Sequence, residues 1–213
     1  WAGRVLEVLR GPIESGVVQI SRAARQSVFA AQFQLVAAMN PCPCGWLGHA
    51  SGRCRCSPDR IRAYRSRISG PLLDRIDLAI DVPALPPDEI AIASDASVAE
   101  PSSRVRERVA AARARQLARQ GVCNAGLTVA DLQRHGVPDG KASALATRAM
   151  SRFGLSARAY HRILKVARTI ADLASADTVG SAHVAEAIGY RRFDSAEFAP
   201  DASPAMPARH GPP

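Results

Sequence analysis

Residues Phe33–Cys44, FQLVAAMNPCPC, join an apolar run to one polar residue and a pair of cysteines. The run 35–39 is apolar without alternation, which predicts a strand buried on both faces of a parallel sheet. Asn40 would then lie at the carboxyl end of the strand, where open α/β sheets bind their ligands, and Pro41 would end the pairing. A buried helix is the alternative, which the shortness of the run and the proline disfavour.

A cysteine motif, C-x-C-x9-C-x-C, begins within the same stretch and has three glycines between its two pairs. Its members are Cys42, Cys44, Cys54 and Cys56. Four thiolates satisfy tetrahedral zinc, so the motif predicts a structural zinc site that fixes the loop after Asn40. An iron–sulfur cluster, His49 in place of one thiolate, and no metal are the alternatives. A disulfide is not expected in a reducing compartment, and Cys123 is expected to pack as a small apolar residue.

A β-hairpin is predicted on the amino-terminal side of this stretch. Two strand-like segments, 17–21 and 27–33, flank a polar linker whose ends carry Arg22 and Arg25. These two arginines belong either to a solvated turn or to a loop that contacts phosphate. The preceding residues, 3–10, have the pattern of an amphipathic helix, which Gly11 and Pro12 are expected to end.

On the carboxyl-terminal side, the segment 69–82, SGPLLDRIDLAIDV, predicts a further strand over its alternating part, 76–82. Arg75 precedes this strand and lies between Asp74 and Asp77. It either forms an ion pair with one of these neighbours or reaches across an interface to a phosphate.

Composition places the chain among ordinary globular proteins. It has 213 residues, of which 47% are hydrophobic and 22% charged. No apolar run approaches the roughly 18 residues of a membrane span, and the start WAGRVLEVLRG is unlike a secretory leader, so no membrane contact and a cytoplasmic location are expected. The net charge of +9 suits a nucleic-acid partner, although a bias toward arginine in the genome would also produce it.

The chain is therefore predicted to be an α/β protein in four parts. Residues 1–84 hold the strands and the cysteine loop, and 85–102 form a linker rich in proline, alanine, serine and acidic residues. Residues 103–194 are expected to be all-α. The last residues, 195–213, have little to bury and are expected to be disordered.

The helical part shows start and stop signals for five helices. The first is expected over 104–120, with Ser102 or Ser103 as its N-cap and Gly121 after its end. A T-x-x-D capping box that uses Asp131 opens the second, over 128–135. The others are expected over 139–153 with Gly154 after it, from Ser156, and after Ser181.

Arg158 lies in the first turn of the helix that starts at Ser156, where the helix macrodipole disfavours a cation. A bound phosphate would explain this position, because the amides of the helix start and the guanidinium would act on the same anion. An exposed arginine that tolerates a small penalty is the alternative.

Four motifs in order, MNPCPCG, CRC, SGPLLDRIDL and LSARAYHRILKVARTIADLA, resemble those of the Mg-chelatase-like AAA+ ATPases of the ComM/YifB competence-protein family. The resemblance extends from about Gly3 to Phe193. It implies an AAA+ P-loop core, here incomplete, followed by a helical lid, with ATP and Mg²⁺ as ligands. It also implies assembly into a homo-oligomer, usually a hexameric ring.

The resemblance implies roles for individual residues. Asn40 corresponds to sensor 1, which orients the attacking water, and Arg75 to the arginine finger, which enters the neighbouring subunit's nucleotide site. Arg158 corresponds to the sensor-2 arginine of the lid. The hairpin corresponds to the pre-sensor-1 hairpin, which faces the central channel in related motors and favours DNA contact by Arg22 and Arg25.

Two motifs of the family are missing. The sequence contains no G-x-x-x-x-G-K-[ST] and no strand that ends in paired acids. The nearest match, GVPDGKA at 136–142, has three residues between its glycines and ends in alanine. The chain is therefore expected to be a carboxyl-terminal fragment that does not hydrolyse ATP by itself.

Three functions fit these patterns. The first is part of a DNA-directed AAA+ motor that drives branch migration when incoming DNA recombines in natural transformation. The second is an ATPase subunit of a chelatase, which inserts a metal into a tetrapyrrole. The third is a zinc-stabilised nucleic-acid-binding module without an ATPase role.

Overall fold

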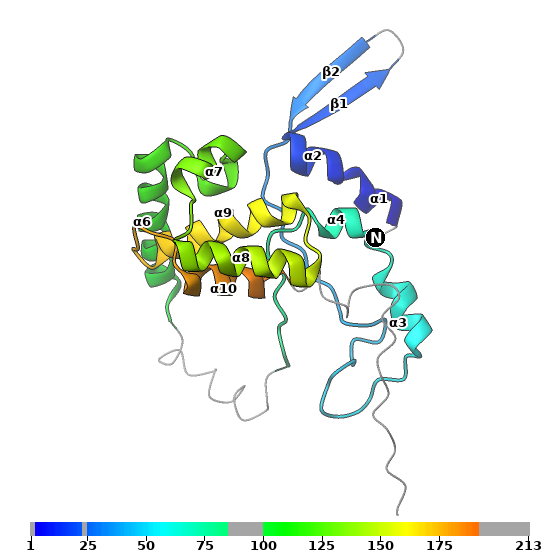
Figure 1. The fold of residues 1–213 in the computed structure, drawn as a ribbon. Helices are drawn as coiled ribbons and strands as arrows, with labels where there is room; N and C mark the ends of the chain where they lie inside the picture. Colours follow the sequence, from blue (N-terminus) through cyan, green and yellow to red (C-terminus); the bar gives the residue numbers. More distant parts are fainter. Residues whose placement is uncertain (1–2, 23–24, 85–99, 192–213) are drawn as a thin grey trace, which may run out of the picture. The chain divides into compact units, whose positions relative to one another are not determined.

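The computed structural model describes residues 3–22, 25–84 and 100–191 (Figure 1). The chain divides into two compact units, the first up to Ile76 and the second Asp77–Arg192. Most of the expected linker 85–102, and the expected tail 195–213, lie outside the described residues. Among the helices that are described, none is long and apolar enough to cross a bilayer.

The first unit begins with two short helices, α1 (Gly3–Val8) and α2 (Arg10–Ser15). The prediction that Gly11 and Pro12 end the helix is wrong, because both lie in the first turn of α2. A proline is tolerated there because the amides of the first turn have no intrahelical acceptor. The helix predicted over 3–10 ends earlier, at Val8, and α2 ends before Gly16, whose φ of 68° is a left-handed conformation.

The predicted hairpin is confirmed. Strands β1 (Val17–Arg22) and β2 (Arg25–Ala30) pair antiparallel and extend away from α2 (Figure 1). The register places Val18 opposite Phe29 and Arg22 opposite Arg25. Because side chains alternate between the faces of a strand, these two pairs share one face, and the Arg22–Arg25 pair lies at its end.

The prediction of a parallel strand over 35–39 is wrong for this structure. The run is irregular and exposed, with 84% of Val36 accessible to solvent. Within the described ranges the only sheet is the two-stranded hairpin. Because a strand needs partners for its amides and carbonyls, the apolar pattern alone does not form one here.

The strand expected over 76–82 is also absent. Residues Leu78, Ile80 and Val82 are exposed, and the segment has no ladder partner among the described residues. The segment is held by a hydrogen bond from Ala79 N to Tyr190 O at 2.9 Å and by an ion pair between Asp77 and Arg162 of the second unit. The segment just before it forms α4 (Gly70–Leu73), where Ser69 Oγ caps the amide of Leu72 at 3.2 Å and Leu72 is buried.

The second unit is helical, as expected. Its elements are α6 (Ser102–Gln120), the 3-10 helix η1 (Asn124–Gly126), α7 (Val129–His135), α8 (Gly140–Phe153), α9 (Ala157–Leu173) and α10 (Ser181–Gly189). Helix α9 contacts α6, η1 and α7, and α10 packs against both α8 and α9. The core lies between α8, α9 and α10 and includes Ala142, Ile163, Ala167, Val179 and Val184.

The helix ends follow local sequence signals closely. The capping box of Thr128 and Asp131 is present, and Ser156 Oγ caps α9. Gly121 and Gly154 have the left-handed conformation that ends α6 and α8. Asp139 caps α8, so the sequence GVPDGKA is an ordinary helix start.

One expected cap is missing. Helix α6 begins at Ser102 itself, and its N-cap is Pro101, whose side chain forms no capping hydrogen bond. The expectation that Ser102 or Ser103 is the cap is therefore wrong. The extended conformation of Pro101 precedes a helix that starts two residues earlier than the expected range 104–120.

A buried ionic network ties α6 and η1 to α9. Asp172, whose side chain is 1% exposed, accepts two bonds from Arg119, at 2.6 and 2.9 Å, and one from Arg168 at 2.9 Å. Asn124 donates a further bond at 2.8 Å. Burial alone would raise the pKa of Asp172, but these hydrogen bonds and charges outweigh it and lower that pKa.

We predict that Asp172→Asn lowers the free energy of unfolding by about 3–5 kcal/mol, because it leaves the buried guanidinium of Arg168 without its carboxylate. The control is Asp177→Asn, which removes an exposed carboxylate and should change little. Urea unfolding followed by circular dichroism measures both changes. Equal stabilities of the two variants would contradict a stabilising network.

The same network predicts a pH dependence. The folded-state pKa of Asp172 is lowered, so its stabilisation is complete above the unfolded pKa of about 3.9 and is lost as pH falls through the folded value. The difference between the parent and Asp172→Asn should therefore shrink in acid.

Candidate functional site

The four cysteines of the motif converge in the first unit. Their sulfur atoms all lie within 4.8 Å of one another. Three of the separations are short: Cys42 Sγ lies 3.3 Å from that of Cys44 and 3.8 Å from that of Cys54, and 3.7 Å separates Cys44 and Cys54. These distances are far longer than a disulfide bond, and all five cysteines of the chain are free thiols.

The loop backbone explains this convergence. Gly45 has a φ of 81°, and its amide donates to Cys42 O at 3.0 Å, which closes a turn round the first pair. The chain then folds back through further turns to the second pair, and the left-handed φ of 60° at Gly52 lies just before it. After Cys56, Ser57 Oγ caps α3 (Pro58–Arg65), so a regular helix fixes that end of the loop.

The thiols differ in acidity because they are close together. Burial opposes ionisation of Cys42, but the neighbouring thiol of Cys44 and the backbone amides outweigh it, and they lower the pKa of Cys42 to about 6. Burial and the thiols already ionised raise the pKa of Cys56 to about 11. One negative charge therefore forms readily, and a cation is needed before all four thiols ionise near neutral pH.

The donor set fits one tetrahedral ion. Zinc–sulfur bonds of about 2.3 Å place the sulfurs of a regular tetrahedron about 3.8 Å apart. The observed separations, which begin at 3.3 Å and do not exceed 4.8 Å, bracket that value. Cys42, Cys44, Cys54 and Cys56 would be the four ligands, and with sulfur donors alone such a site has a structural role.

The two other candidate ligands lie outside this cluster. His49 Nδ1 is 2.7 Å from Ser51 Oγ. The rings of His49 and Trp46 form a T-shaped pair with 4.8 Å between their centroids. The cluster is complete without it, so the alternative in which His49 replaces a thiolate is not supported by the geometry. Cys123 is half-buried in the second unit, before η1.

Asn40 lies beside the cysteine loop. A methyl group built on Gly45 would be 3.7 Å from Asn40 Nδ2, so the amide of Asn40 faces the turn that encloses the first cysteine pair. Arg65 Nε of α3 also reaches this turn and contacts Pro41 O at 3.4 Å. The position of Asn40 is therefore tied to the cysteine cluster through its immediate neighbours.

Arg75 has a partner that its sequence neighbours did not suggest. Its Nη2 and Nε donate to Glu14 Oε2 at 2.6 and 3.1 Å, and Nη1 donates to Pro71 O at 2.7 Å. The side chain of Arg75 is 12% exposed and that of Glu14 is 42% exposed. Glu14 belongs to α2, so this ion pair links α2 to the end of α4.

The remaining predicted residues are on the surface. Arg22 and Arg25 are exposed and directly opposite each other at the end of the hairpin. Arg158 is exposed in the first turn of α9, next to the cap of Ser156. Asn40, Arg75 and the hairpin belong to the first unit and Arg158 to the second.

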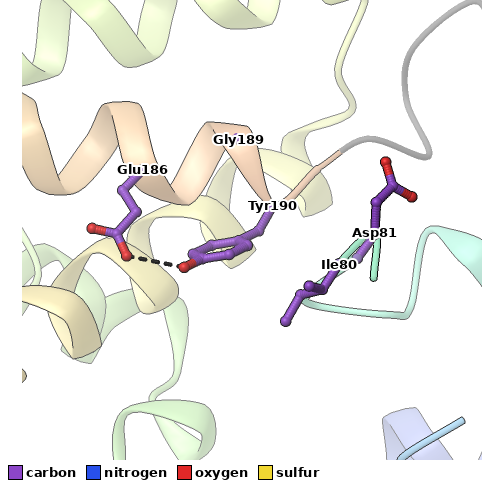
Figure 2. Close-up of a pocket in the computed structure, with 6 residues that line it drawn as sticks. Ile80, Asp81, Glu186, Gly189 and Tyr190 are labelled. Atoms are coloured by element: carbon purple, nitrogen blue, oxygen red, sulfur yellow. Dashed lines mark hydrogen bonds between the residues drawn. The ribbon is translucent and has the colours of Figure 1, made fainter. Parts of the chain in front are cut away.

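A shallow pocket in the second unit contains none of the predicted site residues. The segment 79–81 and the end of α10 line it, and Figure 2 shows the ring of Tyr190 between Glu186 and Ile80. Tyr190 donates to Glu186 Oε1 at 3.0 Å, and this bond raises the pKa of Tyr190. The carboxylate of Asp81 points away from Glu186, so the pocket has no paired acids (Figure 2).

Sequence reasoning missed Glu14 and the network of Asp172. No local signal identifies Glu14, because its partner lies far along the chain. Asp172 was recognisable in part: it is an acid four residues after Arg168 on an otherwise apolar helix face.

Two family models match the chain. One, described as magnesium chelatase, subunit ChlI, matches residues 1–90. The other, described as magnesium chelatase, subunit ChlI C-terminal, matches residues 99–191. The boundary between the two matches lies within the proline- and alanine-rich segment.

Curated relatives match most of the chain. Competence protein ComM of Haemophilus influenzae is 47% identical over 88% of this chain and 36% of its own length. Protein YifB of Escherichia coli is 42% identical over 90% of this chain and 37% of its own length. A Mycobacterium tuberculosis protein, Rv2897c, is 37% identical over 88% of this chain. The chain thus spans little more than a third of the length of these relatives.

We predict that the purified chain binds one equivalent of zinc and that Cys54→Ser loses it, because three thiolates leave the site open. Cys123→Ser is the matched control and should keep the metal, since Cys123 is not part of the cluster. Elemental analysis after dialysis measures the content. Iron at one equivalent, or no metal at all, would contradict the zinc assignment.

Proposed function

This chain belongs to the magnesium-chelatase-like family that includes ComM and YifB, and from that premise we propose that it is part of an AAA+ ATP-dependent motor acting on DNA. The observation that carries the proposal is the 47% identity to a protein named for competence, over 88% of this chain. Competence is the uptake of DNA, and the proposed work is branch migration as incoming DNA recombines.

In this proposal the nucleotide is ATP with Mg²⁺, and the phosphate loop and the acidic pair come from a part of the protein outside these 213 residues. Asn40 orients the attacking water, and Arg158 senses the γ-phosphate from the helical lid. The position of Arg158 supports the second role, because it is exposed in the first turn of α9, where the helix dipole favours an anion.

Arg75 is the proposed arginine finger, which stabilises the charge that develops on the neighbouring subunit's nucleotide. Its ion pair with Glu14 supports a resting position for the guanidinium within the same subunit. Because the Glu14 side chain is 42% exposed, solvent screens part of the ion pair and lowers the cost of exchanging it for a phosphate. The proposed assembly is a hexameric ring, since a finger of this kind acts only between subunits.

The hairpin is the proposed DNA contact. Arg22 and Arg25 are opposite each other on one face, and like charges in that position repel. A DNA phosphate between them would relieve the repulsion. Contacts to phosphate give no sequence preference, which suits a motor that moves along DNA.

A chelatase role is the second candidate, since both matching family models are described as magnesium chelatase subunits. It shares the proposed ATPase chemistry and differs in the partner that receives the work. The cysteine cluster favours the DNA motor, because tetrapyrrole chemistry gives no reason for a structural metal loop beside Asn40. A zinc-stabilised nucleic-acid-binding module without ATPase activity is the third candidate, and the same cluster supports it.

Arg75→Ala in the longest protein that the gene encodes should lower ATP turnover by about 10³-fold or more and leave nucleotide affinity nearly unchanged. Glu14→Gln is the matched control, because it removes the ion pair but keeps the guanidinium. Turnover should survive Glu14→Gln if Arg75 is a finger. Phosphate release measures the turnover of each variant. An equal loss of turnover in both variants would show that turnover depends on the ion pair and not on a finger role of Arg75.

The double variant Arg22→Gln, Arg25→Gln should weaken DNA binding and lower the slope of log affinity against log salt by about 1 to 2, the value for two lost phosphate contacts. Arg134→Gln with Arg148→Gln is the control, since it removes the same charge from exposed positions of α7 and α8. Fluorescence anisotropy over a salt series measures the slope. An unchanged slope in the hairpin variant would show that both arginines belong to a solvated turn and do not contact phosphate.

A further inference from the structure

The segment between Asn40 and Asp74 is strongly basic. It contains six arginines and a single acid, Asp59. Asp59 forms an ion pair with Arg62, so it neutralises only one of them. The cysteine loop and α3 therefore carry an excess of positive charge that the segment itself does not balance.

The fold directs part of this charge outward. Residues 53–56 are outside any helix, and the sulfurs of Cys54 and Cys56 turn toward the cluster. The alternating residues Arg53 and Arg55 are exposed, as expected when neighbouring side chains in an extended segment point to opposite sides. Arg60 is exposed in the first turn of α3, just after the second cysteine pair. We call Arg53, Arg55 and Arg60 the basic loop surface.

An aromatic side chain adjoins this surface. Trp46 is 37% exposed, and the guanidinium of Arg53 lies 5.1 Å from the centre of its ring. Cation–π contact keeps the arginine and the indole together at the surface. Exposed tryptophan beside arginine is the combination with which proteins bind the bases and phosphates of single strands.

The other arginines of the segment have different roles. Arg65 reaches the backbone at Pro41, and Arg67 lies 5.8 Å over the ring of Tyr64. Helix α6 is also rich in arginine, but it contains no aromatic residue, and two of its arginines form ion pairs, Arg108 with Glu100 and Arg119 with Asp172. The basic loop surface thus joins exposed positive charge to an exposed tryptophan, and none of its three arginines forms an ion pair with an acid among the described residues.

We propose that the basic loop surface is a second DNA-binding surface, which holds the phosphates of a single strand through Arg53, Arg55 and Arg60 beside Trp46. It is separate from the hairpin, because the two are formed by different segments of the first unit. The choice of DNA over RNA rests on the proposed function, whereas the contact with a single-stranded polyanion rests on the geometry alone. A metal held by the four cysteines would then fix the basic loop surface as well as the cysteine loop.

The test measures binding of a fluorescein-labelled oligothymidylate of about 20 nucleotides, longer than one such site. The chain is compared with the triple variant Arg53→Gln, Arg55→Gln, Arg60→Gln over a salt series. The charge-matched control is Arg134→Gln, Arg148→Gln, Arg152→Gln, at exposed positions of α7 and α8. Retained metal and circular dichroism show that each variant is folded.

The triple variant should bind at least about 10-fold more weakly, and its salt slope should fall by about 2, the value for three phosphates on a single strand. The control should keep the slope. If the triple variant keeps the parent's slope while Arg22→Gln, Arg25→Gln loses it, this inference is overturned and the proposed function stands. If neither the parent nor any variant binds DNA, both this inference and the proposed DNA motor fail. Binding of oligouridylate without binding of oligothymidylate would support a single-strand contact at the basic loop surface and contradict the DNA motor.

A second measurement does not depend on the arginine variants. In a Trp1→Phe background, Trp46 is the only tryptophan of the chain. Saturating oligothymidylate should quench its emission, because bases come to lie beside the indole. Unchanged Trp46 emission at saturation would overturn the inference even if the affinity of the triple variant falls.

Discussion

The convergence of four sulfur atoms is the constraint on which the organisation of residues 40–57 depends. Among the described residues of the first unit, Cys42 and Leu72 are the only hydrophobic residues that are buried. The unit therefore has almost no apolar core within the described ranges, and its loop is long and rich in glycine. A metal held by four thiolates can supply the missing folding free energy, which for structural zinc is on the order of 10 kcal/mol.

The positions of the neighbouring polar residues follow from this constraint. Asn40 faces the turn at Gly45, and the exposed arginines alternate with the second cysteine pair. The second unit is held differently: α8, α9 and α10 share an apolar core, and the ionic network of Asp172 joins α6 to it. A helical unit with an apolar core and a unit with almost none within the described ranges are physically distinct solutions within one chain.

Local signals in the sequence predicted local structure well. The capping box of Thr128, the glycine after α8 and the hairpin are confirmed, because each depends on residues that are close in sequence. The cysteine spacing likewise predicted the cluster. The strands at 35–39 and 76–82 were wrong, since a strand exists only if a partner strand pairs with it. The ion pair of Arg75 with Glu14 joins distant segments, and no periodicity reports such a contact.

X-ray absorption at the zinc edge is the sharpest test that four cysteines form a closed metal site, because it counts the ligand atoms and measures their distances from the metal without a crystal. The structure brings four sulfurs, and no imidazole nitrogen, to one point. A closed site of four cysteines predicts a single shell of four sulfurs at about 2.3 Å. A shell with nitrogen or oxygen ligands, or with fewer than four sulfurs, would contradict a closed cysteine site as the constraint that organises this loop.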